Sequence, residues 1–148
     1  MQTLSETLPR TGPLHRAGQL WGRWKQRLAR ARTDARLRAE LRHELGCLDQ
    51  AGELDGVLAN LGLARAAIPG LLERYPGSVR RYAFMARRVG ARPPSPRAGL
   101  VALMGSRRRC LFCGESRRCE RWLETGAREG HRDFCPNADA FDRMKKNA

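Results

Sequence analysis

Four of the five cysteines of the chain lie close together in its C-terminal third. They follow the spacing C-x2-C-x5-C-x15-C, and they are Cys110, Cys113, Cys119 and Cys135. Cysteine thiolates are ligands of structural zinc ions and of iron–sulfur clusters, and a Cys-x2-Cys pair can reach one ion from a single turn. The spacing therefore predicts one metal site with four thiolate ligands.

The residues beside these cysteines predict how the sulfurs converge. Gly114 is expected to let the backbone turn after Cys113, where a side chain would clash. Ser116 is expected to cap a helix that holds Cys119 in its first turn, and Cys135 is expected at or near the start of a final helix. Because the N-terminus of a helix carries partial positive charge, both positions are predicted to favour a thiolate over a thiol.

The same four cysteines could instead form two disulfides or remain free thiols in a core. No export signal is visible, so a reducing compartment is expected, which disfavours structural disulfides. Zinc suits the Cys-x2-Cys-Gly turn and a closed set of four thiolates. A [4Fe–4S] cluster takes the same ligands, often with a Cys-Pro ligand such as Cys135-Pro136, and nearby arginines would offset its charge. We expect Zn²⁺, with the cluster as the alternative.

Four aromatic residues near the ligands are expected to form the small core of this module and to keep water from the metal. They are Phe112, Trp122, Phe134 and Phe141. His131 could substitute as a ligand, but a lone histidine in a polar segment is expected to be a solvated loop residue. Cys47 has no partner nearby in the sequence and is expected to be a small buried apolar residue.

The formal net charge of +14 indicates a partner that is itself anionic: phosphate, anionic lipid or an acidic protein. The charge is dense from Arg10 to Arg42, where apolar residues at helical spacing also occur. This basic arm is predicted to be helical and only partly docked, because its apolar stripe is interrupted. Nucleic-acid contacts are predicted for Arg16, Trp21, Arg23, Trp24, Lys25, Arg27, Arg30, Arg32, Arg36 and Arg38.

These residue types suit single-stranded nucleic acid. Arginine neutralises phosphates, and tryptophan stacks on unpaired bases. The arm could also be a merely solvated basic helix face, or it could dock on an acidic protein or an anionic membrane.

The chain is predicted to be all-α, in three parts: a basic arm at 1–46, a small domain of short helices at 47–91, and a metal-stabilised four-cysteine helical module at 92–148. The run "ARPPSPRAG" stops any helix before the module. A short helix is expected next, starting at Ser95-Pro96 and carrying three apolar residues: Leu100, Leu103 and Met104.

Within the middle part, the segments 54–61 and 68–75 carry apolar residues at i, i+3, i+4 and i+7, which is the spacing of one helix face. These stripes are expected to form the core. Pro76-Gly77 is expected to end one helix, Ser78 to cap the next, and Gly90 to end that one.

An enzyme is not expected. The sequence has no phosphate-binding loop, nucleophile elbow or zinc-protease motif, and a site with four thiolates offers no open position for chemistry. With no membrane-spanning run, the protein is expected to be soluble and cytoplasmic. A nucleic-acid-binding accessory protein, with RNA as ligand, is the preferred function; an iron–sulfur redox or metal sensor and an adaptor protein are the alternatives.

Three stretches of the sequence resemble those of a known family. "LANLGLARAAI", "CLFCGESRRC" and "FCPNA" make the segment from Arg42 to Met144 similar to an uncharacterised bacterial family with a helical lead and a terminal cysteine module. The stretch from "LWGRWKQR" to "LGLARAAI" also resembles short arginine-rich bacterial proteins, some of them linked to RNA. The resemblance implies the cysteine module and a bacterial cytoplasm, and it implies no activity.

Overall fold

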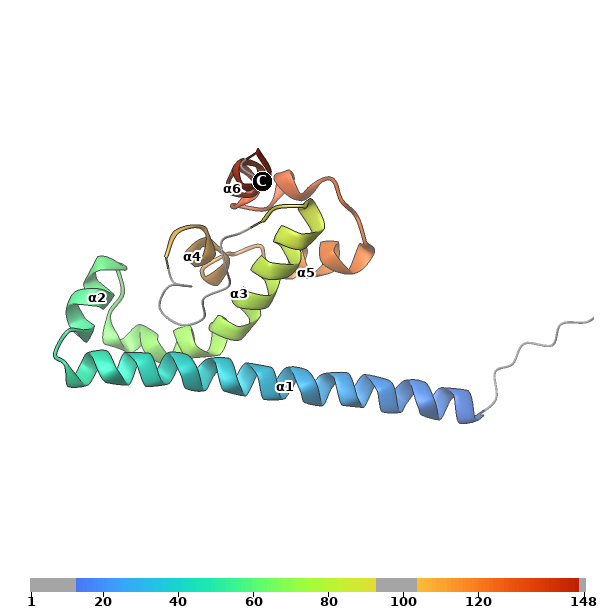
Figure 1. Cartoon of the computed structure of the whole chain (residues 1–148), viewed down its shortest axis with the longest axis horizontal. Coiled ribbons are helices and arrows are strands. Elements are labelled where there is room, and N and C mark those ends of the chain that lie inside the picture. Colours follow the sequence, from blue (N-terminus) through green and yellow to red (C-terminus); the bar gives the residue numbers. More distant parts are fainter. Residues whose placement is uncertain (1–12, 93–103, 147–148) are drawn as a thin grey trace, which may run out of the picture. The chain divides into compact units, whose positions relative to one another are not determined.

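A computed structural model describes residues 13–92 and 104–146, and the side chains of 18–92 and 104–145 (Figure 1). In these ranges the chain forms α-helices and two short 3-10 helices, and no strand. The prediction of an all-α fold is confirmed. The α-helices are α1 (Pro13–Gln50), α2 (Leu54–Asn60), α3 (Ile68–Val89), α4 (Gly105–Leu111), α5 (Ser116–Thr125) and α6 (Ala138–Lys146), and the 3-10 helices are η1 (Arg65–Ala67) and η3 (His131–Asp133).

The chain divides into two compact units, residues 1–33 and 34–148. The predicted domain boundaries after residues 46 and 91 remain predictions. The short helix predicted from Ser95 onward lies outside the described residues, apart from Met104, which directly precedes α4. Within the described ranges, no helix combines the length and the apolar character needed to cross a membrane.

The first hydrophobic cluster of the second unit joins four helices. Its buried residues are Leu41 and Leu45 of α1, Leu54 and Leu58 of α2, Leu61 directly after α2, Leu71 and Tyr75 of α3, and Leu111 of α4. The apolar stripes predicted over 54–61 and 68–75 therefore do form core, because one face of each short helix is buried. Arg80 of α3 also pairs with Asp34 of α1.

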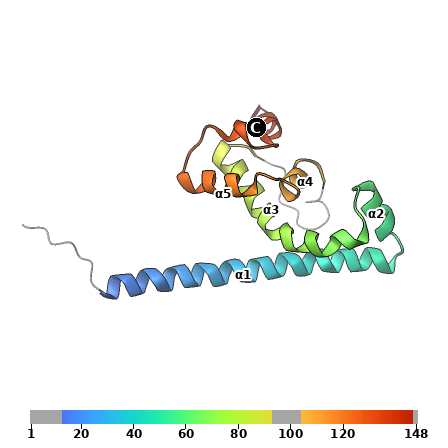
Figure 2. The same cartoon turned by 180° about the vertical axis from the view of Figure 1, so that it is seen from behind.

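The prediction that Pro76-Gly77 ends a helix is wrong. Helix α3 continues through Pro76, which is fully buried. Figures 1 and 2 show α3 changing direction along its length, and a proline inside a helix is a usual cause of such a bend, because it lacks the N–H of one helical hydrogen bond. Ser78 is no cap; its hydroxyl donates to the Tyr75 carbonyl oxygen at 2.7 Å. Burial on both sides of Pro76 holds the helix together.

The second hydrophobic cluster surrounds the C-terminal half of α3. Its buried residues are Tyr82, Met85, Ala86, Val89, Ala91, Cys110, Cys119 and Phe141. Gly90 ends α3 in the left-handed conformation with φ of 74°, as predicted. Two arginines of α3 also hold α5: Arg81 pairs with Glu120 at 3.0 Å, and Arg88 donates to the Leu123 carbonyl oxygen at 3.1 Å. Helix α3 is thus the element on which the cysteine module is built.

Candidate functional site

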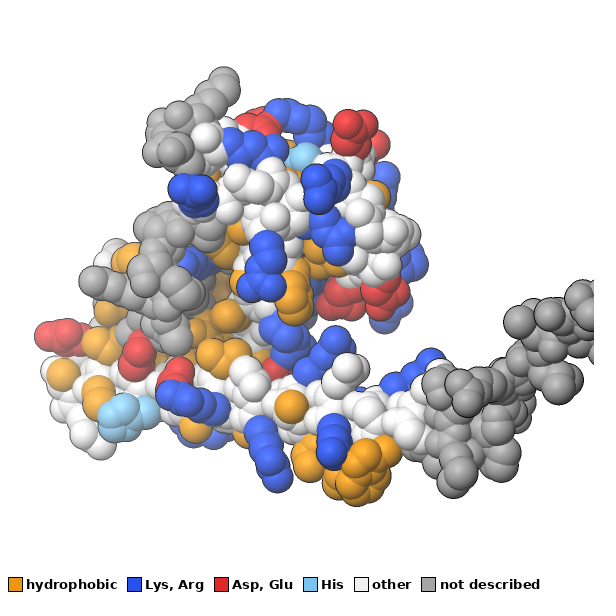
Figure 3. Space-filling view, turned by 45° about the vertical axis from the view of Figure 1, so that its right-hand side comes forward, with side chains coloured by type: hydrophobic (Ala, Val, Ile, Leu, Met, Phe, Trp, Pro, Cys, Tyr) orange, Lys and Arg blue, Asp and Glu red, His pale blue; other side chains and the backbone are white. Residues whose placement is uncertain are grey.

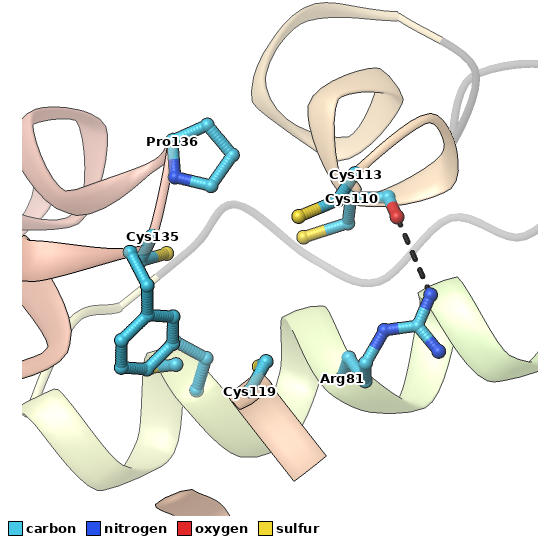
Figure 4. Close-up of a pocket in the computed structure, with 8 residues that line it drawn as sticks. Arg81, Cys110, Cys113, Cys119, Cys135 and Pro136 are labelled. Carbon is cyan, nitrogen blue, oxygen red and sulfur yellow. Dashed lines mark hydrogen bonds between the residues drawn. The ribbon is translucent and has the colours of Figure 1, made fainter. Parts of the chain in front are cut away.

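The four clustered cysteines come from three separate places in the module and line one cavity (Figure 4). Cys110 lies in the last turn of α4, and Cys113 follows that helix. Cys119 lies in α5, and Cys135 lies between η3 and α6. Cys110 and Cys119 are buried, and the other two are half-buried. Segments separated by up to 25 residues are therefore brought to one point.

The space between the four cysteines is small, about 10 Å³. Its remaining walls are Met85, Phe134, Pro136 and Arg81, so three of the four other lining residues are apolar. In Figure 4, the sulfurs of Cys110 and Cys113 point toward Cys135, and the side chain of Arg81 extends from α3. A cavity of this size holds about one water-sized sphere.

The side chains do not stand in the geometry of a formed metal site. Among the described residues, no group of three or more His, Cys, Asp or Glu side chains is arranged to hold a metal ion. The structure therefore brings the four cysteines to one cavity, but not into an arrangement ready to hold an ion. A metal-stabilised module remains a prediction.

The predicted preference for thiolates is wrong for the chain without metal. Burial raises the pKa of Cys110 to about 12 and that of Cys119 to about 11, and it also raises the pKa of Cys135. Loss of hydration disfavours the charged form, and the neighbouring cysteines add repulsion between like charges. For Cys119 and Cys135 these effects outweigh the nearby helix N-termini, so burial favours the protonated thiol at both positions.

The local backbone also differs from the prediction. Gly114 has no positive φ, and a Cβ atom there would meet nothing within 4 Å, so the turn does not require glycine. Ser116 is the first residue of α5 rather than its cap, and its helix makes no side-chain cap bond. Cys135 lies three residues before α6, where its carbonyl oxygen accepts the N–H of Ala138 at 3.1 Å.

Sequence reasoning missed Asn137. This side chain is fully buried, and its Nδ2 donates to Cys110 Sγ at 3.2 Å and to the Ser106 carbonyl oxygen at 2.7 Å. The motif "CPNA" contained the signal, since an amide beside a predicted ligand can donate to sulfur.

Three predictions about neighbouring residues are wrong. His131 is buried at 6% exposure, packed 5.8 Å from Trp122 between ring centroids, and is not a solvated loop residue. It does not line the cysteine cavity. Cys47 is exposed, 3.7 Å from the His43 ring, because it lies on the outer face of α1. Phe112 is 44% exposed, whereas Phe141 is fully buried and Trp122 and Phe134 pack at the edge of the core.

The arm exposes both of its tryptophans. Trp21 is 57% and Trp24 is 52% exposed, and the two rings stack with centroids 5.0 Å apart. Lys25 lies 5.5 Å above the Trp21 ring. Leu20 and Leu28 are exposed as well. Figure 3 shows hydrophobic side chains gathered on the surface of this stretch of α1, with basic side chains nearby.

A second group of arm residues lines a shallow hollow of about 290 Å³ on α1: Arg23, Gln26, Arg27 and Arg30. The structure brings these three arginines together and leaves other predicted contacts apart. Arg32 is exposed but does not line the hollow, and the side chain of Arg16 lies outside the described ones. Arg36 and Arg38 belong to the second unit, where Arg36 donates to Glu40 at 2.9 Å.

Comparison with known proteins finds one similarity. No curated protein and no solved structure matches the chain at a significant level. The sequence predicted a likeness to an uncharacterised family from Arg42 to Met144. A family model matches the C-terminal part of that segment, but residues 42–95 lie outside the matched range. Residues 96–147, which contain the four clustered cysteines, match the model of a family of unknown function (DUF6455).

Proposed function

We propose that the chain is a nucleic-acid-binding accessory protein whose basic arm contacts single-stranded RNA and whose four clustered cysteines hold one structural Zn²⁺. The observation that carries the RNA proposal is the exposed, stacked pair Trp21 and Trp24 on the same helix as the arginine hollow. Aromatic faces in water next to clustered guanidinium groups are the two components of sequence-tolerant binding to single strands.

The arrangement on α1 suits a strand that offers phosphate and base together. An α-helix has about 3.6 residues per turn, so Arg23, Arg27 and Arg30 share one face. Trp24 lies three residues before Arg27, and residues at this separation are neighbours on a helix surface. A nucleotide whose phosphate meets the arginine hollow can therefore present its base toward the tryptophan side.

An anionic membrane is the competing partner for this arm, because Leu20 and Leu28 are exposed on the tryptophan side. Interfacial helices need a broad apolar face. Between residues 18 and 33, four arginines and one lysine are exposed beside the apolar side chains, and the stretch contains no acidic residue. The balance of charge over apolar area favours RNA.

The metal proposal rests on the donor set around the cavity. Four sulfurs from separate segments surround one small space whose other walls are mostly apolar. A closed set of four thiolates is typical of a structural zinc site. The volume of about 10 Å³ suits a single ion better than a [4Fe–4S] cluster, whose bridging sulfides need more room. Loading would require local adjustment of the side chains and release of thiol protons.

The RNA proposal is tested with the full chain by fluorescence anisotropy. Labelled single-stranded RNA and duplex DNA of equal length are titrated across a salt series, and vesicles of phosphatidylcholine with phosphatidylserine are tested by flotation. We expect RNA affinity to fall with salt, with a log–log slope of about −0.7 per neutralised phosphate. Replacing Arg23, Arg27 and Arg30 by Gln should make this slope shallower by roughly 2.

The matched control is Arg65→Gln. Arg65 is already bound by Asp49 and Asp55, at 2.7 and 2.6 Å, so its loss removes one charge without touching the arm. It should leave the salt slope unchanged. Absence of binding to RNA and DNA at low salt contradicts the RNA proposal, and binding to vesicles alone would assign the arm to a membrane surface.

A further inference from the structure

The buried side chain of Asn137 links two of the four cysteines across the module. Its Nδ2 donates to Cys110 Sγ at 3.2 Å and to the Ser106 carbonyl oxygen at 2.7 Å. Its backbone N–H faces the sulfur of Cys135 and acts to lower the pKa of that thiol. Asn137 thereby reaches one sulfur at the end of α4 and another before α6, and it has no exposed surface.

The chemistry of its neighbours fixes the orientation of this amide. The Ser106 carbonyl oxygen can only accept a hydrogen bond, and the Cys110 sulfur accepts one from Nδ2. The NH₂ group has two N–H donors, one for each of these acceptors. A flipped amide would place its oxygen against the Ser106 carbonyl oxygen, and that contact would be repulsive. The Oδ1 atom has no hydrogen-bond partner among the described residues, so the burial of Asn137 is not explained by satisfaction of its own carbonyl.

Resting on the proposed metal site, we propose that Asn137 is a positioning residue for it: its side-chain N–H holds the sulfur of Cys110 and its backbone N–H holds that of Cys135, and these contacts set the affinity for Zn²⁺. Hydrogen bonds from outside the ligand set orient the ligands and share their charge. Replacing such a partner commonly lowers metal affinity by about 10- to 100-fold.

The surroundings explain why these donors matter here. Four thiolates and one Zn²⁺ carry a net charge of about −2 in a site with few polar walls. Arg81 is the cation that lines the cavity, with its side chain 14% exposed, and part of its charge is already engaged by Glu120. Arg81 also donates to the Cys110 carbonyl oxygen at 3.4 Å rather than to a sulfur. The hydrogen bond to the Cys110 sulfur comes instead from Asn137.

The test measures Zn²⁺ affinity of the full chain by competition with a chromophoric chelator. Asn137→Ala should weaken binding by about 10- to 100-fold. Asn137→Asp should weaken it further, because a carboxylate oxygen would then face the Ser106 carbonyl and the Cys110 thiolate. The control is Asn60→Ala, the same change at an exposed residue at the end of α2, which should leave the affinity unchanged.

A spectroscopic measurement separates positioning from a merely structural role. In the Co²⁺-loaded chain, the sulfur-to-cobalt charge-transfer band reports the electron density on sulfur. Losing the side-chain N–H donor to the Cys110 sulfur raises that density, so the band of Asn137→Ala should move to lower energy while the d–d bands stay tetrahedral. An unchanged band with unchanged affinity would overturn the inference.

A third measurement needs no variant and covers the case in which Asn137→Ala fails to fold. In ¹¹³Cd-loaded, ¹⁵N-labelled wild-type chain, the side-chain and backbone amides of Asn137 should show scalar coupling to the metal through the sulfurs. Resolved Asn137 signals without either coupling would refute the inference. Failure of the wild-type chain to bind Zn²⁺, Co²⁺ or Cd²⁺ is a different outcome, since it would refute the proposed metal site itself.

Discussion

The ring of Tyr82 in α3 contacts the ring of Phe141 in α6, with centroids 5.2 Å apart and planes tilted by 46°. Phe141 is fully buried, and the Tyr82 hydroxyl also lies 3.0 Å from Ser106 Oγ. This contact ties the last helix of the cysteine module to the helix that supports it. The stability of the module should therefore depend on it.

Phe141→Ala should lower the free energy of unfolding by about 3–5 kcal/mol, because it leaves a cavity at a buried aromatic contact. Phe112→Ala is the matched control at a residue that is 44% exposed, and it should cost less than about 0.5 kcal/mol. Urea unfolding followed by circular dichroism measures both. Equal effects of the two changes would refute the assignment of Phe141 to the core and Phe112 to the surface.

Replacing any one of the four clustered cysteines by Ser should abolish zinc binding and loosen the module, because metal-binding free energy at such a site is largely folding free energy. Cys47→Ser is the control, since Cys47 is exposed and remote from the cavity. Limited proteolysis and near-ultraviolet circular dichroism follow the module directly. A Cys135→Ser chain with full zinc content and unchanged protection would argue against the four-thiolate site.

Alkaline pH should destabilise the metal-free chain. Burial raises the folded-state pKa of Cys110 to about 12 and of Cys119 to about 11, from an ordinary value of 9.0. Because the folded pKa lies above the unfolded one, this stability is complete below pH 9 and is lost as pH rises toward 11–12. Denaturation in chelator at several pH values should show this loss, and Cys110→Ser should make it smaller. A stability that rises between pH 9 and 11 would contradict the direction.

Trp21→Ala and Trp24→Ala should each weaken single-stranded RNA binding by about 1–3 kcal/mol, with a smaller effect on duplex DNA, since each loses one stacking surface. Thermal stability should not change, because both rings are exposed. Trp122→Ala is the contrasting control: this residue packs against the second core cluster, so it should lower stability and leave RNA affinity intact. If the two arm variants lose thermal stability but keep their preference for single-stranded RNA over duplex DNA, the two rings serve packing rather than RNA binding.

Helical periodicity predicted the core faces well. The predicted stripes over 54–61 and 68–75 both fall in one hydrophobic cluster, because this spacing places apolar residues on one helix face that can be buried. The end of α3 at Gly90 followed from local chemistry, since glycine adopts the left-handed conformation without steric cost. These features depend on short-range sequence.

The failures involve tertiary surroundings. Pro76 reads locally as a helix stop, yet packing on both sides of it keeps α3 continuous. The nearby helix starts predicted a lowered pKa for Cys119 and Cys135, whereas burial raises the pKa of both thiols. Arg81 and Arg88 contribute to the net charge from which an anionic partner was predicted, although both side chains bind groups of α5. Each of these features depends on contacts with segments that are distant in the sequence, which local sequence patterns do not report.

The central claim is that one metal ion is held by Cys110, Cys113, Cys119 and Cys135. Native mass spectrometry of the full chain, purified without oxygen and without added chelator, tests it most directly when combined with elemental analysis. We predict about one zinc per chain, lost together with the folded module on chelation. About four iron atoms per chain would instead indicate that the four cysteines hold a [4Fe–4S] cluster. A metal-free chain whose module stays fully folded would contradict the claim.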